Sequence, residues 1–246
     1  MKSKLLYVEF IGIPGAGKTA LANEVISMLP YHKCFGRPVM SNLKKLETTN
    51  IYFVKYSLLF SGFILRRFRL IIFAFRYLCE SNVFNSLRSV CKLIFVLYRI
   101  EVAIRKCCLS DYDFILLDQG ILQELWSISI NGNLPANEFV IRVVECLNTQ
   151  KIFIAVDIDA NEALKRIGNR LTMTSRFDRM PSVKAKALLR ENLINYTKII
   201  DSVRSTDRTR ILEVNGMDEL SKNASYIKDI MLQTQGGMLH RGSTPQ

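Results

Sequence analysis

The chain has 246 residues, enough for one domain with a substantial core or for one domain with a sizeable insertion. Its apolar content of 49% and charged content of 23% are ordinary for a globular protein and exclude an intrinsically disordered one. The formal net charge of +12 favours anionic partners such as nucleotides, phosphorylated metabolites, nucleic acid or acidic lipid headgroups. The six cysteines show no metal-binding spacing, which is typical of reduced thiols in a cytoplasmic protein.

The first predicted elements enclose a glycine-rich segment. Residues 4–11 are a mostly apolar run that predicts a buried strand, and residues 18–29 carry apolar side chains at helical spacing. The N-terminal stretch lacks the small-residue cleavage pattern of a signal peptide, and no transmembrane helix is evident. Residues 33–40 are ambiguous and are consistent with a short second strand.

The segment between that strand and helix matches the phosphate-loop pattern G-x-x-x-x-G-K-[ST]. Its residues are Gly12, Ile13, Pro14, Gly15, Ala16, Gly17, Lys18 and Thr19. In such a loop the backbone N–H groups wrap phosphate oxygens, and the first turn of the next helix, which includes Ala20, points its positive end at them. Lys18 would reach the β and γ phosphates, and the Thr19 hydroxyl would bind Mg²⁺. The sequence therefore predicts a nucleoside-triphosphate site.

Residues 50–108 are aromatic and basic. Residues 51–108 hold ten Lys or Arg against Glu80 and Glu101, so they carry +8 of the net charge. Basic residues recur at helix-like spacings, which predicts two helices broken near residues 80–86. The main interpretation is a helical pair packed on a sheet with its arginines in solvent. The alternatives are peripheral contact with an anionic membrane through 50–108 and a homodimer face; no specific nucleic-acid binding is expected because no such motif is present.

The remaining chain alternates strand and helix patterns. Apolar runs predict strands at 113–118, 151–157 and 209–214, and helices are predicted at 121–130, 136–148, 160–170, 182–204 and 218–232. This alternation predicts an α/β fold in which a parallel sheet is covered by helices on both faces. We expect one domain over 1–235 with a helical insertion at 43–110, followed by a flexible tail at 236–246.

A phosphate loop usually needs an acidic residue at the end of a neighbouring strand to hold the magnesium shell. Asp118 ends the 113–118 run and precedes Gly120 and a new helix, at the strand end where ligands gather in open α/β sheets. Its alternative role is a plain helix cap. Asp157 is the competing candidate, although Asp159 after it indicates a strand exit followed by a helix cap. The sequence therefore predicts Asp118 and Thr19 as metal ligands.

Four arginines fall between residues 164 and 180: Arg166, Arg170, Arg176 and Arg179. The first two are four residues apart and share a helix face, whereas the last two lie in a predicted loop. Phosphoryl transfer needs positioning and neutralisation of charge, which the planar guanidinium supplies, and a closing segment would also exclude water. The alternative is an exposed basic helix end.

Five stretches occur in the order found in thymidylate-kinase-like P-loop kinases: "GIPGAGKT", "FILLDQG", "VDIDANEALKRIGNR", "SRFDRM" and "RILEVNGMDELSKNASYIKDI". The chain resembles that family outside 43–110. The resemblance implies a P-loop NTPase fold, three layers around a mainly parallel sheet of about five strands, with a lid at about 166–181. It implies ATP and Mg²⁺ as cofactors, catalysis by Lys18, Asp118, Arg170 and Arg176, and ATP contact by Arg166. "GRP" at 36–38 is similar to the family's arginine before a proline, which implies that Arg37 contacts the acceptor.

The chain departs from the family pattern after the acidic strand end, where Asp118 is followed by Gln119 rather than by arginine. Gln119 as an acceptor contact indicates a neutral hydroxyl acceptor, such as a nucleoside or sugar. We therefore expect an ATP-dependent kinase that acts on a nucleotide, nucleoside or other small hydroxyl or phosphate acceptor. The alternatives are a regulatory ATPase that contacts a protein or membrane through the insertion, and a module that only binds nucleotide.

Overall fold

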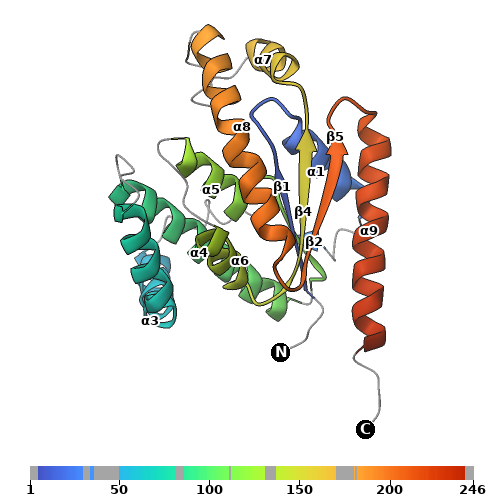
Figure 1. Ribbon diagram of the computed structural model, residues 1–246. Coiled ribbons are helices and arrows are strands. Elements are labelled where there is room, and N and C mark those ends of the chain that lie inside the picture. The colour runs from blue at the N-terminus through green and yellow to red at the C-terminus, as the bar shows by residue number, and fades with distance from the viewer. Residues whose placement is uncertain are drawn as a thin grey trace.

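The computed structural model describes residues 5–29, 34–35, 50–80, 86–110, 112–130, 137–169, 180 and 182–241. At its centre lies a five-stranded sheet in the order β2-β3-β1-β4-β5, and every neighbouring pair is parallel (Figure 1). The strands are β1 (Leu6–Ile11), β2 (Cys34–Phe35), β3 (Phe114–Leu117), β4 (Gln150–Asp157) and β5 (Thr209–Asn215). The predicted parallel α/β sheet of about five strands is confirmed, and the ambiguous segment 33–40 contains the short strand β2.

The burial of the strands explains why their sequences are so apolar. Every residue of β1 and β3 is buried, because both strands lie inside the sheet with helices over each face. β5 lies at the edge, and only Leu212 and Val214 of its seven residues are buried. A continuous apolar run therefore marks an inner strand here, and a partly polar run marks the edge.

Helices cover both faces of the sheet (Figure 1). On one face lie α1 (Lys18–Ser27) and α9 (Leu220–Arg241), which pack on each other and on β1 and β5. On the other lie α4 (Ser86–Leu109), α5 (Ile121–Ser129) and α8 (Ser182–Arg204), which contact β3, β1 and β5 respectively. Two shorter helices, α6 (Asn137–Glu145) and α7 (Ala160–Gly168), pack against α8.

The basic region forms two helices, as predicted. The first, α3 (Asn50–Glu80), packs on α4 and α6 rather than directly on the sheet. Its Phe63 ring lies 5.6 Å from the Tyr98 ring of α4, and its Tyr77 ring stacks 4.8 Å from Phe139 of α6. Within the described residues α4 packs against β3, whereas α3 packs mainly against α4 and lies at the outer edge of the molecule (Figure 1). Among the described helices, none combines the length and the apolar character that crossing a bilayer would require.

The last helix is longer than the sequence pattern predicts. We expected a helix over 218–232 and a tail from residue 236, but α9 continues to Arg241. The glycine pair at 236–237 resembles a helix stop, yet glycine inside a helix costs only about 1 kcal/mol relative to alanine and leaves the backbone hydrogen bonds intact. The expected tail at 242–246 lies outside the described residues.

Candidate functional site

The phosphate loop, residues 12–19, connects the buried end of β1 to the start of α1. Gly15 and Gly17 have φ angles of 91° and 89°, in the left-handed region that side chains disfavour. A Cβ atom on Gly15 would also lie 2.4 Å from the Ala163 carbonyl oxygen. Because both backbone angle and space exclude a side chain at Gly15, α7 can approach the loop closely. The glycines found by motif are thus explained by local geometry.

Lys18 begins α1 and turns back over the loop. Its side chain is buried, and Nζ donates hydrogen bonds to the carbonyl oxygens of Gly12 at 2.7 Å and Ile13 at 3.0 Å. The residue before the helix, Gly17, provides no side-chain cap. A helix start without a side-chain cap leaves its first amides for other acceptors, and an anion is the ligand that they and an ammonium group favour.

Thr19 and Asp118 meet beside this loop. The Thr19 hydroxyl donates a hydrogen bond to Asp118 Oδ2 at 3.0 Å, although one residue starts α1 and the other follows β3. Asp118 is buried while Thr19 is exposed, so the pair lies at the protein surface, where solvent reaches it from the Thr19 side. The two residues predicted as metal ligands are therefore adjacent.

The chemistry of this pair fits magnesium. Mg²⁺ prefers oxygen ligands and is usually held by one or two carboxylates together with water and substrate phosphates. The Asp118 carboxylate and the Thr19 hydroxyl, next to a phosphate loop, supply the few protein ligands that such a magnesium site needs. In the described part of the chain no group of three His, Cys, Asp or Glu side chains forms a fuller metal site.

A buried polar cluster lies behind the loop. Glu9 of β1 is fully buried; Tyr7 donates its hydroxyl to Glu9 Oε2 at 2.7 Å, and the Gln123 backbone N–H donates to Oε1 at 3.0 Å. The Gln123 side chain in turn accepts the Gly12 N–H at 3.3 Å. Burial raises the pKa of Glu9 to about 7, although these donors oppose the shift. The cluster joins β1, the first turn of α5 and the first residue of the phosphate loop.

Sequence reasoning missed this cluster. Its one signal was a charged residue inside an apolar strand run, which is unusual because a buried carboxylate needs partners. Gly120 belongs to the same arrangement, since a Cβ atom there would lie 2.5 Å from both Glu9 Oε2 and the Tyr7 hydroxyl. The neighbouring Gln119 is exposed beside Asp118.

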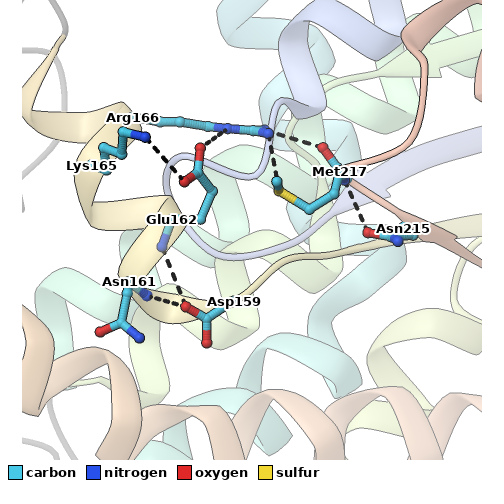
Figure 2. Close-up of polar contacts among 8 residues, drawn as sticks. Asp159, Asn161, Glu162, Lys165, Arg166, Asn215 and Met217 are labelled. Atoms are coloured by element: carbon cyan, nitrogen blue, oxygen red, sulfur yellow. Dashed lines mark hydrogen bonds and ion pairs between the residues drawn. The ribbon is translucent and has the colours of Figure 1, made fainter.

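Arg166 lies on α7 and extends toward Met217 in the connection between β5 and α9 (Figure 2). From α7 its guanidinium donates to Glu162 Oε1 at 3.2 Å, to the Gly216 carbonyl oxygen at 3.2 Å and to Met217 Sδ at 3.3 Å. Its Nη1 atom is 3.8 Å from the position of a Cβ on Gly17. Arg166 thus links α7, the β5–α9 connection and the phosphate loop, which suits a residue predicted to contact ATP.

The strand end at Asp157 has a different arrangement. The Asp157 carbonyl oxygen accepts the Gly216 N–H at 2.6 Å, and its side chain is exposed. Asp159 caps α7 by accepting from the backbone N–H groups of Asn161 at 2.8 Å and Glu162 at 3.4 Å (Figure 2). These hydrogen bonds, Asn161 first, lower the pKa of Asp159. This confirms the predicted strand exit and cap, and Asp118 is the acidic side chain placed beside Thr19.

The other predicted site residues cannot be placed. Arg37, Arg170, Arg176 and Arg179 lie outside the described residues. The acceptor contact and most of the arginine lid therefore stay predictions.

No family profile and no curated protein sequence matches this chain. Two solved structures of deoxyadenosine kinase from M. mycoides are similar to it in three dimensions. The one with the products dCMP and dCDP shares 14% identity with a TM-score of 0.52, and covers 92% of this chain and 99% of that chain. The one with bound dCTP shares 16% identity with a TM-score of 0.50, over the same shares of the two chains. At such identities the likeness concerns the fold alone, and it confirms the predicted three-layer α/β P-loop fold.

Proposed function

We propose that this chain is an ATP-dependent kinase that transfers the γ-phosphoryl group to a small-molecule acceptor. The observation that carries the proposal is the 3.0 Å contact between Thr19 and Asp118, next to a phosphate loop that encloses the Lys18 ammonium. A phosphate-loop threonine and an acidic strand end held together are what a magnesium-bound nucleoside triphosphate requires.

The proposal gives each residue of the site a role. The backbone of residues 12–19 and the start of α1 hold the β and γ phosphates, and Lys18 neutralises charge on them. Thr19 and Asp118 hold Mg²⁺, which when bound offsets the charge that develops on the phosphates. Arg166 contacts the nucleotide from α7, and Arg170 and Arg176 close over the phosphates and exclude water.

Residue 119 and the two similar structures narrow the class of acceptor that we propose. Gln119 stands where the resembled family has an arginine for an acceptor phosphate, so a neutral hydroxyl fits this position better than a phosphate does. The two similar structures are kinases of a nucleoside. We therefore rank nucleosides first, nucleoside monophosphates such as thymidylate second, and other hydroxyl metabolites third, with Arg37 as an acceptor contact.

An acceptor screen tests the proposal. Purified protein with Mg-ATP is offered deoxynucleosides, nucleosides, their monophosphates and sugars, and ADP is measured together with the phosphorylated product. We expect one acceptor class to raise ADP formation above the acceptor-free rate. Lys18→Ala should lower that turnover roughly a hundred- to a thousandfold while leaving the circular dichroism spectrum unchanged. ATP binding without transfer to any acceptor would contradict the proposal.

The second candidate is a regulatory ATPase, and the exposed apolar residues of α3 favour it. It predicts slow ATP hydrolysis without an acceptor, which anionic vesicles or a protein partner stimulate. The same assay, run with vesicles in place of the acceptor, distinguishes the two.

A further inference from the structure

One side of α3 exposes a row of large apolar side chains. Leu65, Phe68, Ile72 and Phe75 have 77%, 56%, 49% and 48% of their surface in solvent. Their spacing of three, four and three residues places them in one stripe along the helix. We call this stripe the outer face of α3. A contiguous exposed apolar row of this kind is uncommon on a monomer and usually marks a contact surface.

The outer face is not the side by which α3 joins the protein. Phe63 and Ala74 are the buried residues of the described part of this helix, and they lie roughly opposite the stripe. Phe63 packs on Tyr98, and Phe73 stacks 5.9 Å from Phe139. Because α3 is already anchored on α4 and α6, its outer face is left for something other than the core.

Basic residues lie along one edge of the outer face. Arg69 and Arg76 are exposed and, seven residues apart, lie along one edge of the stripe. Over its whole length α3 holds five Lys or Arg against one acidic residue, Glu80, at its last position. Glu101 of α4 pairs with Arg66 and Arg67, which lie closer to the packed side.

We propose that the outer face of α3 lies on an anionic membrane surface. The four apolar side chains enter the boundary between headgroups and acyl chains, and Arg69 and Arg76 contact lipid phosphates. This combination of an apolar stripe with basic residues along its edge is typical of helices that lie in the membrane interface.

Charge decides between this occupant and a second copy of the chain. Two outer faces brought together would oppose two like-charged segments, because residues 51–108 carry a net charge of +8 in each copy. An anionic lipid surface instead supplies both the apolar layer and the opposite charge. The inference goes beyond the proposed kinase activity and does not depend on it.

Vesicle sedimentation tests the proposal. The full chain is mixed with vesicles of phosphatidylcholine alone or of phosphatidylcholine with phosphatidylglycerol. We expect binding to the anionic vesicles that weakens as salt increases, and little binding to the neutral ones. Arg69→Gln with Arg76→Gln should weaken partitioning roughly thirtyfold, and Phe68→Ser with Phe75→Ser about tenfold or more.

Matched controls remove equivalent groups on the other side of the sheet. Tyr226→Ser with Leu232→Ser removes two apolar groups that are exposed to a similar degree on α9, and Arg210→Gln with Lys222→Gln removes two exposed charges. Both should bind vesicles as the wild type does. Equal binding to neutral vesicles, absence of binding, or equal losses in the controls would overturn the proposal. So would a dimer in light scattering that Phe68→Ser with Phe75→Ser dissociates, because the face would then belong to a second copy.

Discussion

Thr19 and Asp118 are 99 residues apart in the chain, yet a hydrogen bond of 3.0 Å joins their side chains. The contact follows from the parallel pairing of β1 with β3, which brings the carboxyl ends of the two strands to the same edge of the sheet. In our proposal the Thr19 hydroxyl offers a lone pair to Mg²⁺ while donating its proton to Asp118.

Thr19→Val tests this role at the level of one hydroxyl. Valine keeps the shape of threonine and removes the oxygen, so we expect the Mg²⁺ concentration needed for half-maximal turnover to increase roughly ten- to a hundredfold. Thr19→Ser is the matched control, because it retains the hydroxyl and should behave like the wild type. An unchanged Mg²⁺ dependence in Thr19→Val would remove the residue from the metal site.

Glu9 is the residue whose position sequence reasoning did not explain. Its carboxyl group bridges Tyr7 and the Gln123 backbone, and the Gln123 side chain holds the Gly12 N–H. The pKa of Glu9 is raised to about 7 chiefly by burial. The folded state therefore retains this proton at a pH where the unfolded chain has released it, and Glu9 lowers stability as the pH rises between about 4.5 and 7.

Glu9→Gln should remove that pH dependence. Glutamine keeps an oxygen for the Gln123 N–H and carries no titrating proton. We expect the unfolding free energy of the variant, relative to the wild type, to increase by roughly 3 kcal/mol between pH 4 and pH 8, measured by urea denaturation. Tyr7→Phe is the companion variant. It removes a donor that lowers the pKa of Glu9, so the decrease of its stability with rising pH should extend to higher pH than in the wild type. A difference in unfolding free energy between Glu9→Gln and the wild type that stays constant with pH would contradict the raised pKa of Glu9.

At the scale of elements, α7 and the β5–α9 connection enclose the phosphate loop. Arg166 crosses from α7 to the carbonyl oxygen of Gly216, and a Cβ on Gly216 would lie 3.0 Å from the Ala16 carbonyl oxygen. The predicted lid, at about 166–181, begins in the last residues of α7. An arginine carried by that lid would therefore start from an element already in contact with the loop.

The lid prediction is tested with Arg176→Ala. A lid contact forms mainly in the transition state, so we expect the turnover number to fall on the order of a hundredfold or more while the Kd for ATP changes little. Arg176→Lys keeps a positive charge without the planar fork and should recover only part of the activity. If only ATP binding weakened, the residue would belong to the nucleotide site and not to the lid.

The C-terminal end of α9 allows a prediction about helix stability. Gly236 is inside the helix, and a Cβ there would meet no other atom within 4 Å. Gly236→Ala should therefore stabilise this end of α9 by about 0.5–1 kcal/mol and slow amide hydrogen exchange around residue 236. Gly236→Pro should have the opposite effect. Identical exchange in the wild type and the alanine variant would mean that the helix ends earlier.

At the scale of the whole molecule, the parts predictable from sequence are those whose cause is local. The inner strands are short apolar runs because both of their faces are buried. Gly15 and Gly17 of the phosphate loop are required by their backbone angles. Asp118 could be selected because a carboxylate after such a run lies at the ligand-binding edge of a parallel sheet.

The parts that could not be predicted depend on partners far along the chain. Nothing near Glu9 indicates that its partner is Gln123, 114 residues away. The helix α3 is apolar around most of its circumference, so its pattern does not say which stripe packs on α4 and which stays exposed. The expected tail from residue 236 is wrong up to Arg241, because α9 continues through the glycine pair at 236–237.

The central claim is that residues 12–19 hold the triphosphate of a magnesium-bound nucleotide. The most direct measurement is a crystal structure with Mg²⁺ and a non-hydrolysable ATP analogue. The account predicts the β and γ phosphates inside the loop, Lys18 Nζ on their oxygens, and the metal between Thr19 and Asp118. A nucleotide bound elsewhere, or a triphosphate that contacts neither Lys18 nor the loop amides, would contradict it.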